Sequence, residues 1–168
     1  MKRKNKGFTL SELLIVVAII AVLVAISIPI FSKQLEKSRR AVDIANARSI
    51  RSAMTLALNQ EDLQITDDST EIVLHISGSK IDGAVSGNMD HVFIEGVRYP
   101  GYNAMWQLFS KYGISDQIRM KQKSNSIEWY AVSINGKGES YYYEGKGEMM
   151  KYKNTSVATK YDWNELSD

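Results

Sequence analysis

A single glutamate stands at the start of a long apolar stretch of the sequence. The run from Leu13 to Phe31 contains no ionisable residue, and Glu12 comes immediately before it. A carboxylate inside a membrane span costs roughly 2.5–3.5 kcal/mol at the centre and less near an end. One interpretation is that Glu12 merely marks the headgroup-level start of a span. The other, favoured because ionisable residues inside membranes are by default functional, is that Glu12 has a partner.

The α-amine of Phe8 would be such a partner if the chain were cut after Gly7. That amine would lie four residues before Glu12, or about 6 Å along a helix. It could meet Glu12 of its own chain, or Glu12 of a neighbouring chain shifted along the helix axis. An intermolecular pair of this kind would set the register between packed helices.

The apolar run is long enough to cross a membrane. As a helix, Phe8 to Phe31 would extend about 36 Å, against a hydrocarbon core of ~30 Å. Basic residues precede it at Lys2, Arg3, Lys4 and Lys6. Basic residues on this short side favour a cytoplasmic N-terminus, with the remainder of the chain outside. The run ends without an Ala-x-Ala cleavage site, so we expect the anchor to be retained.

The residues from Gly7 read Gly-Phe-Thr-Leu-Ser-Glu-Leu-Leu, after a short basic leader and before an apolar helix that contains Pro29. This resembles the class III signal of type IV pilins and pseudopilins. The resemblance implies that a membrane prepilin peptidase cuts after Gly7 and N-methylates Phe8, and that Glu12 supports assembly. Ser11 departs from the valine that is commonest in the family. The resemblance covers about the first 31 residues.

One long helix is predicted from about Phe8 to about Leu58. There is no Gly or Pro from Gln34 to Asn59, and apolar residues recur there at three- and four-residue steps. Pro29 removes one backbone donor, so we expect a kink at that point; the alternative is that Pro29 ends the membrane helix. The first half is apolar all round, and residues 32–58 are amphipathic.

The rest of the chain predicts an α+β head, in which a small antiparallel sheet packs on the long helix. The expected domains are a cleaved leader (1–7), the helix (8–58, of which 8–31 is transmembrane or filament core) and the head (59–168). Period-two patterns and turn residues predict these strands: 70–76, 91–95, 117–123, 126–134, 139–144 and 148–153. We expect loops at 78–88 and 96–101, a hairpin turn at 135–138 and a tail or last loop at 154–168.

A short helix is predicted from Asn103 to Tyr112, with Asn103 as its cap. The apolar face of this helix is expected to pack on the sheet: Met105, Leu108, Phe109 and Tyr112. In the strand at 70–76, Ile72, Leu74 and Ile76 would share one face. His75 would then lie on the other face, at the surface or beside a neighbouring strand. One or two rings of the Tyr141-Tyr142-Tyr143 run are expected to pack against the long helix.

The charge balance and the cysteine content bear on possible partners and on disulfides. Four of the 21 lysine and arginine residues lie in the leader, so the chain from Phe8 onward carries 17 basic against 19 acidic residues. A mature chain of that charge gives no reason to expect nucleic-acid binding. There is no cysteine, hence no disulfide. Many Gram-negative members of the family that this sequence resembles have a disulfide, so its absence favours a Gram-positive host.

No catalytic constellation or cofactor motif is present, so we expect neither an enzyme nor a cofactor. His75 and His91 lack metal-ligand spacing. The acidic residues of the segment after the long helix could hold calcium, although a solvated loop is the simpler interpretation: Asp62, Asp67, Asp68 and Glu71. Asn154 begins a glycosylation pattern that is frequent by chance.

The main hypothesis is a structural subunit of a type IV pilus or related filament. Its expected partners are other pilin subunits, the prepilin peptidase, an inner-membrane assembly platform and, before assembly, the lipid bilayer. It would wait in the cytoplasmic membrane with the head outside, then enter an extracellular filament. The alternative is a membrane-anchored extracellular binding domain that does not polymerise, which would need neither Gly7-Phe8 nor Glu12.

Overall fold

The computed structural model describes residues 7–123, 126–148, 153 and 158–166. Its first element is the long helix α1, Leu10–Asn59. The prediction of one long helix is therefore confirmed, and the alternative that Pro29 ends the helix is wrong. The kink at Pro29 stays a prediction. By length and composition, α1 is the one helix in the described part of the chain that is apolar enough to cross a membrane.

The chain divides into two compact units, one up to Ser38 and one from Arg39 to the C-terminus. In the first unit the apolar side chains of α1 lie open to the surroundings. In the second unit the same helix buries one face at three- and four-residue intervals: Ile44, Ala47, Ile50, Ala53, Met54 and Ala57. The amphipathic pattern predicted for residues 32–58 therefore has its apolar face against the head.

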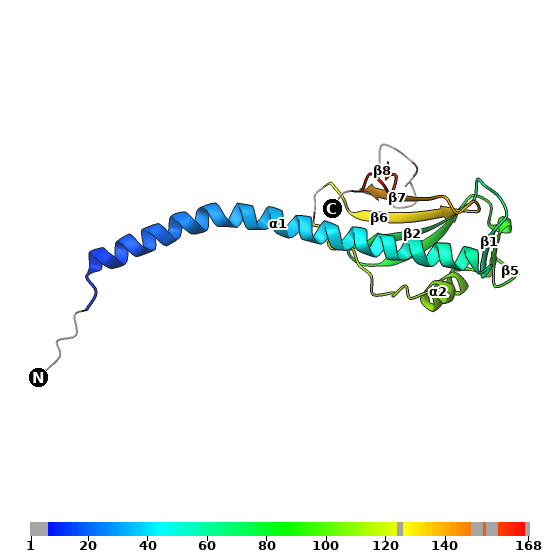
Figure 1. Ribbon diagram of the computed structural model, residues 1–168, viewed down its shortest axis with the longest axis horizontal. Helices are drawn as coiled ribbons and strands as arrows, with labels where there is room; N and C mark the ends of the chain where they lie inside the picture. The colour runs from blue at the N-terminus through cyan, green and yellow to red at the C-terminus, as the bar shows by residue number, and fades with distance from the viewer. Residues whose placement is uncertain (1–6, 124–125, 149–152, 154–157, 167–168) are drawn as a thin grey trace, which may run out of the picture. The chain divides into compact units, whose positions relative to one another are not determined.

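That face packs on a five-stranded antiparallel sheet, along which α1 runs (Figure 1). The strand order is β3-β2-β6-β7-β8. The strands are β2 (Glu71–Ser77), β3 (Ile81–Ser86), β6 (Trp129–Asn135), β7 (Ser140–Gly145) and β8 (Ala158–Tyr161). Alternate residues of β2 and β6 join the helix in the core: Ile72, Leu74, Ile76, Tyr130, Val132 and Ile134.

A second, three-stranded antiparallel sheet lies at the end of the unit where α1 terminates (Figure 1). It has the order β1-β4-β5, with β1 at Leu63–Ile65, β4 at Val92–Ile94 and β5 at Val97–Arg98. The 3-10 turn η1, Met89–His91, leads into β4. The helix α2, Tyr102–Lys111, buries Met105, Leu108 and Phe109 as predicted.

Several local predictions are wrong. Residues 78–88 contain strand β3 rather than a loop. Within it, a side chain at position 83 would collide with Met105 of α2, so the glycine allows the helix to approach the strand. Asn103 does not cap α2, because the N-cap position is Gly101, with φ 110° and no side-chain cap bond.

Residues 117–123 form no strand. Their backbone N–H groups bond elsewhere: Met120 donates to the carbonyl of Ser77, and Lys121 and Gln122 donate to the carboxylate of Asp43. The alternation seen in the sequence therefore does not correspond to pairing in a sheet.

The face of the sheet opposite α1 is also covered. Val73, Trp129, Ala131, Tyr143 and Ala158 form a second buried cluster there. His75 is only 1% exposed and makes an edge contact with Trp129 of the neighbouring strand β6. Of the two positions expected for it, the one beside a neighbouring strand is therefore confirmed and the one at the surface is wrong. The prediction for the tyrosine run is confirmed, because Tyr142 is buried in the cluster that contains the α1 residues.

The last strand of the sheet is not where the sequence placed it. The predicted strand at 148–153 falls largely outside the described residues. β7 pairs with β6 on one side and with β8 on the other, and β8 lies inside the segment expected to be a tail. Trp163 of the same segment donates to the carbonyl of Ser140, and Leu166 is buried. The C-terminal segment is thus part of the folded head.

Candidate assembly site

The candidate site lies where the chain enters α1. Gly7, Phe8 and Thr9 precede the first helical residue, and Phe8 is 90% exposed. A Cβ at Gly7 would meet no other atom within 4 Å. Among the described residues, nothing therefore packs against the Gly7–Phe8 peptide bond.

Glu12 is held by Thr9 in a reciprocal capping arrangement. One carboxylate oxygen of Glu12, Oε2, accepts from the backbone N–H of Thr9 and from its hydroxyl, both at 2.8 Å. The N–H of Glu12 lies 3.3 Å from the Thr9 hydroxyl oxygen. This is a capping box, which satisfies donors at a helix start that would otherwise lack partners.

The capping role of Thr9 was not among the expectations from the sequence. The signal was available, because Thr9-Leu10-Ser11-Glu12 has the Ser/Thr-x-x-Glu spacing of a capping box. While Phe8 remains bonded to Gly7, its nitrogen is an amide and carries no charge. In the uncut chain the Glu12 carboxylate is therefore bonded by Thr9 rather than by a free amine.

The apolar side chains that follow have no protein around them. Leu13 is 61% exposed, Ile28 61% and Phe31 71%. Exposed apolar surface on this scale requires either lipid or other protein chains. The capped helix start and the exposed apolar surface that follows it together suit a helix that lies in a membrane or packs against other chains.

The acidic residues considered for calcium have other partners. Lys111 donates to Asp62 at 2.6 Å, and Lys137 lies 2.7 Å from Asp68. These two bonds raise the pKa of each lysine above its ordinary value. Lys153 pairs with Glu71 at 3.2 Å. Within the described ranges, no group of three or more His, Cys, Asp or Glu side chains is arranged to hold a metal.

Residues 2–28 match the family model described as the prokaryotic N-terminal methylation motif. The chain is 30% identical over 162 residues to a type IV major fimbrial protein, FimA, of Dichelobacter nodosus; the match covers 95% of this chain and 98% of that protein. The chain belongs to the type IV pilin family. Members of this family are structural subunits rather than enzymes.

Other pilins are similar mainly over a shorter stretch. The type IV major pilin PilA of Myxococcus xanthus is 39% identical over 69 residues, which cover 41% of this chain and 31% of that pilin. The narrow-pilus major component PilA5 of Thermus thermophilus is 46% identical over 57 residues, or 34% and 49% of the two chains. No solved structure matches. These relatives do not support the preference for a Gram-positive host.

Proposed function

We propose that this pilin is cut after Gly7 by a prepilin peptidase, N-methylated at Phe8 and assembled through α1 into a type IV pilus or related filament. The observation that carries the proposal is the combination of a bare apolar helix with a carboxylate held at its start. A plain anchor needs the first feature but gains nothing from the second, since a charge near the membrane is costly.

Cleavage changes the partner of Glu12. It converts the amide nitrogen of Phe8 into an ammonium group, four residues before Glu12. That ammonium can pair with Glu12 of a neighbouring chain while Thr9 still bonds the same carboxylate. In the filament, the apolar surface from Leu13 to Phe31 then exchanges lipid for neighbouring helices, and the head from about residue 59 coats the outside.

Before assembly, the protein lies in the cytoplasmic membrane with the head outside, in contact with the prepilin peptidase and an inner-membrane assembly platform. The basic leader supports this orientation. The expected mature chain starts at Phe8, and mass analysis of the purified protein measures this directly. Gly7→Val should block cleavage, because the side chain obstructs approach to the peptide bond. A mature chain that retains Met1 would contradict the proposal.

The variant Glu12→Leu distinguishes the filament-subunit proposal from the alternative of a membrane anchor that does not polymerise. An anchor should insert as well or better without the charge. A subunit should be cut and accumulate in the membrane but be poorly incorporated, because the Phe8 amine would be buried unpaired at a cost of about 3–5 kcal/mol per subunit. Immunoblots of sheared surface material against membranes measure the split. Glu12→Asp is the matched control and should be milder. Normal filaments of the Glu12→Leu protein would favour the anchored-domain alternative.

A further inference from the structure

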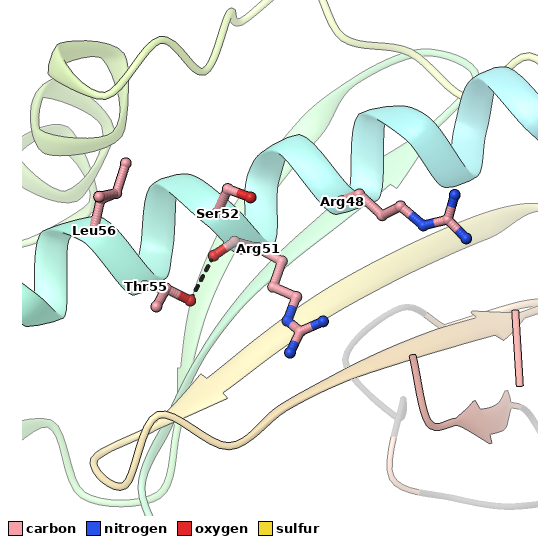
Figure 2. Close-up of a pocket in the computed structure, with 5 residues that line it drawn as sticks. All are labelled: Arg48, Arg51, Ser52, Thr55 and Leu56. Carbon is pink, nitrogen blue, oxygen red and sulfur yellow. Dashed lines mark hydrogen bonds between the residues drawn. The ribbon is translucent and has the colours of Figure 1, made fainter. Parts of the chain in front are cut away.

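The hollow beside α1 that Figure 2 shows is lined by residues of that helix: Arg48, Arg51, Ser52, Thr55 and Leu56. Both arginines contact the C-terminal segment of the same chain. Arg48 donates to the carbonyl of Leu166 at 3.1 Å, and the guanidinium of Arg51 lies 4.9 Å from the ring centre of Trp163. The arginines of this hollow are therefore engaged within the chain.

A group of aromatic side chains lies elsewhere on the head, where α2 contacts β3. Tyr102 and Trp106 are one helical turn apart on α2, and their rings are nearly parallel, with 11° between the planes and 6.4 Å between the centroids. Tyr99 precedes the helix. Tyr102 is 39% exposed, and the other two side chains are partly exposed. We name these three residues the aromatic cluster.

The position of Tyr102 is set by β3. A Cβ at Gly83 would lie 3.4 Å from Cε2 of the Tyr102 ring, so the glycine allows the ring to lie close to the strand. Packing on β3 accounts for part of the ring surface. The exposed fraction shows that a large part remains open.

The polar atoms of the aromatic cluster are not used by the fold. The other two tryptophans of the chain each donate the indole N–H to a backbone carbonyl. Among the described residues, the indole N–H of Trp106 and the hydroxyls of Tyr99 and Tyr102 have no hydrogen-bond partner. Aromatic side chains with a polar group usually satisfy it when they are buried. These three groups are instead available to solvent or to a ligand.

An ion pair borders the aromatic cluster. Nζ of Lys80 lies 2.8 Å from Oδ2 of Asp82, and Oδ1 accepts from the N–H of Gly83 at 2.9 Å. The two charged side chains are 56% and 43% exposed. The carboxylate therefore keeps further lone pairs, and the ammonium keeps further N–H donors. Burial, and then the charge of Asp82, raise the pKa of the Tyr102 phenol, while Lys80 lowers it, so the phenol lies within electrostatic reach of the pair.

We propose that the aromatic cluster and the Lys80–Asp82 pair bind a pyranose sugar. A pyranose has C–H groups on its face and hydroxyls around its edge. The C–H face can lie on the open part of the Tyr102 ring, where both surfaces leave water. The hydroxyls can donate to Asp82 and accept from Lys80, and hydrogen bonds to charged groups are the stronger kind. Because donor and acceptor are both present, the site needs no net charge.

An open surface of this kind should bind one sugar weakly. A methyl pyranoside has about 13 non-hydrogen atoms, for which the dissociation constant is on the order of 1 mM. Repetition of the site along a filament would raise the avidity for a surface that carries many sugars. Only this gain in avidity rests on the proposed function.

Saturation-transfer NMR on the full-length protein in phosphocholine micelles tests the site. The probes are the methyl glycosides of glucose, galactose, mannose and N-acetylglucosamine. At least one should receive saturation, mainly at the ring C–H protons of one face. Tyr102→Ala should weaken its binding roughly tenfold, because the stacking surface is lost. Tyr102→Phe keeps that surface and should bind nearly as well.

Two further variants separate the parts of the site. Asp82→Asn removes the charged acceptor and should weaken binding about five- to tenfold. The matched control is Tyr141→Ala, at a partly exposed tyrosine whose ring is covered by the Lys160 ammonium at 3.3 Å. It should leave sugar binding unchanged. Melting temperatures close to that of the unmodified chain show that the variants are folded.

Saturation of none of the four glycosides would overturn this inference, and so would undiminished binding by folded Tyr102→Ala. Cyclohexanol has a similar apolar face but a single hydroxyl. If it bound as well as the glycosides, and Asp82→Asn had no effect, the cluster would be an apolar contact surface for another chain, and the sugar site would also be overturned. None of these outcomes bears on filament formation. The absence of filaments from the unmodified protein would contradict the proposed function and leave the binding of single sugars unaffected.

Discussion

At the scale of single residues, Asp43 has a role that its place in a helix does not suggest. It is fully buried, and its carboxylate accepts from the N–H of Lys121 at 2.7 and 3.0 Å and from that of Gln122 at 2.9 Å. Asp43→Ala should lower the free energy of unfolding by about 2–4 kcal/mol, because two backbone donors lose their acceptor. Urea denaturation measures this. Asp116→Ala, at an exposed position, is the control, and an equal effect of the two changes would contradict the assignment.

Asp43 should also make the stability of the head depend on pH. Burial raises the pKa of its carboxyl above the ordinary 3.8, and the N–H groups of Gln122 and Lys121 oppose this. Since the folded head binds this proton more tightly than the unfolded chain, the contribution is greatest below pH 3.8 and falls as pH rises through the folded-state pKa. Asp43→Asn keeps one acceptor and does not titrate. Its stability relative to the wild type should therefore improve across about pH 3 to pH 6, and a constant difference would contradict this.

At the scale of elements, α2 depends on its buried face. Phe109 is completely buried in the core cluster that α1 and the sheet share. Phe109→Ala should cost about 3–5 kcal/mol, the usual range for a buried aromatic side chain, and lower the melting temperature of the head. Ser110→Ala, on the exposed side of the same helix, should change it little. A melting temperature unchanged by Phe109→Ala would mean that the core does not rely on this face.

The packing of the C-terminal segment is a second feature of this scale. Arg40 lies 3.3 Å from the buried carboxylate of Glu144, which also accepts from the hydroxyl of Tyr142 at 2.9 Å. Trp163 makes an edge contact with the Tyr142 ring. The helix, β7 and the segment after β8 are thus joined around one tyrosine, whose pKa burial raises well above its usual range.

At the scale of the whole molecule, the head should fold without the apolar run. The unit from Arg39 onward contains the buried clusters on both faces of the sheet. We expect a chain that begins at Lys33 to be monomeric in dilute solution and to unfold cooperatively, because the large exposed apolar surface lies before that point. Sedimentation and thermal melting measured by circular dichroism test this. Soluble aggregates or a non-cooperative melt would show that the head needs the first half of α1.

The sequence by itself was enough to identify the pilin-like N-terminal segment. Its signals are local: a Gly-Phe junction, a carboxylate four residues later, and an uninterrupted apolar run whose length matches a bilayer. The same holds for α1, α2, and the hairpin of β6 and β7, where period and turn residues agree. Even the capping role of Thr9 could have been predicted, since its partner is three residues away.

Only the tertiary structure decided how the head is completed. Residues 117–123 alternate like a strand, yet the N–H groups of Lys121 and Gln122 donate to Asp43, 78 and 79 residues earlier in the chain. The Gly-, Ser- and Asp-rich composition of 78–88 conceals β3, where the side chain of Met105 from α2 packs closely over Gly83. His75 alternates outward but is buried under the second cluster. In each case the deciding partner is distant in sequence, so neither periodicity nor local propensity contains the information. Long-range packing and hydrogen bonding override both.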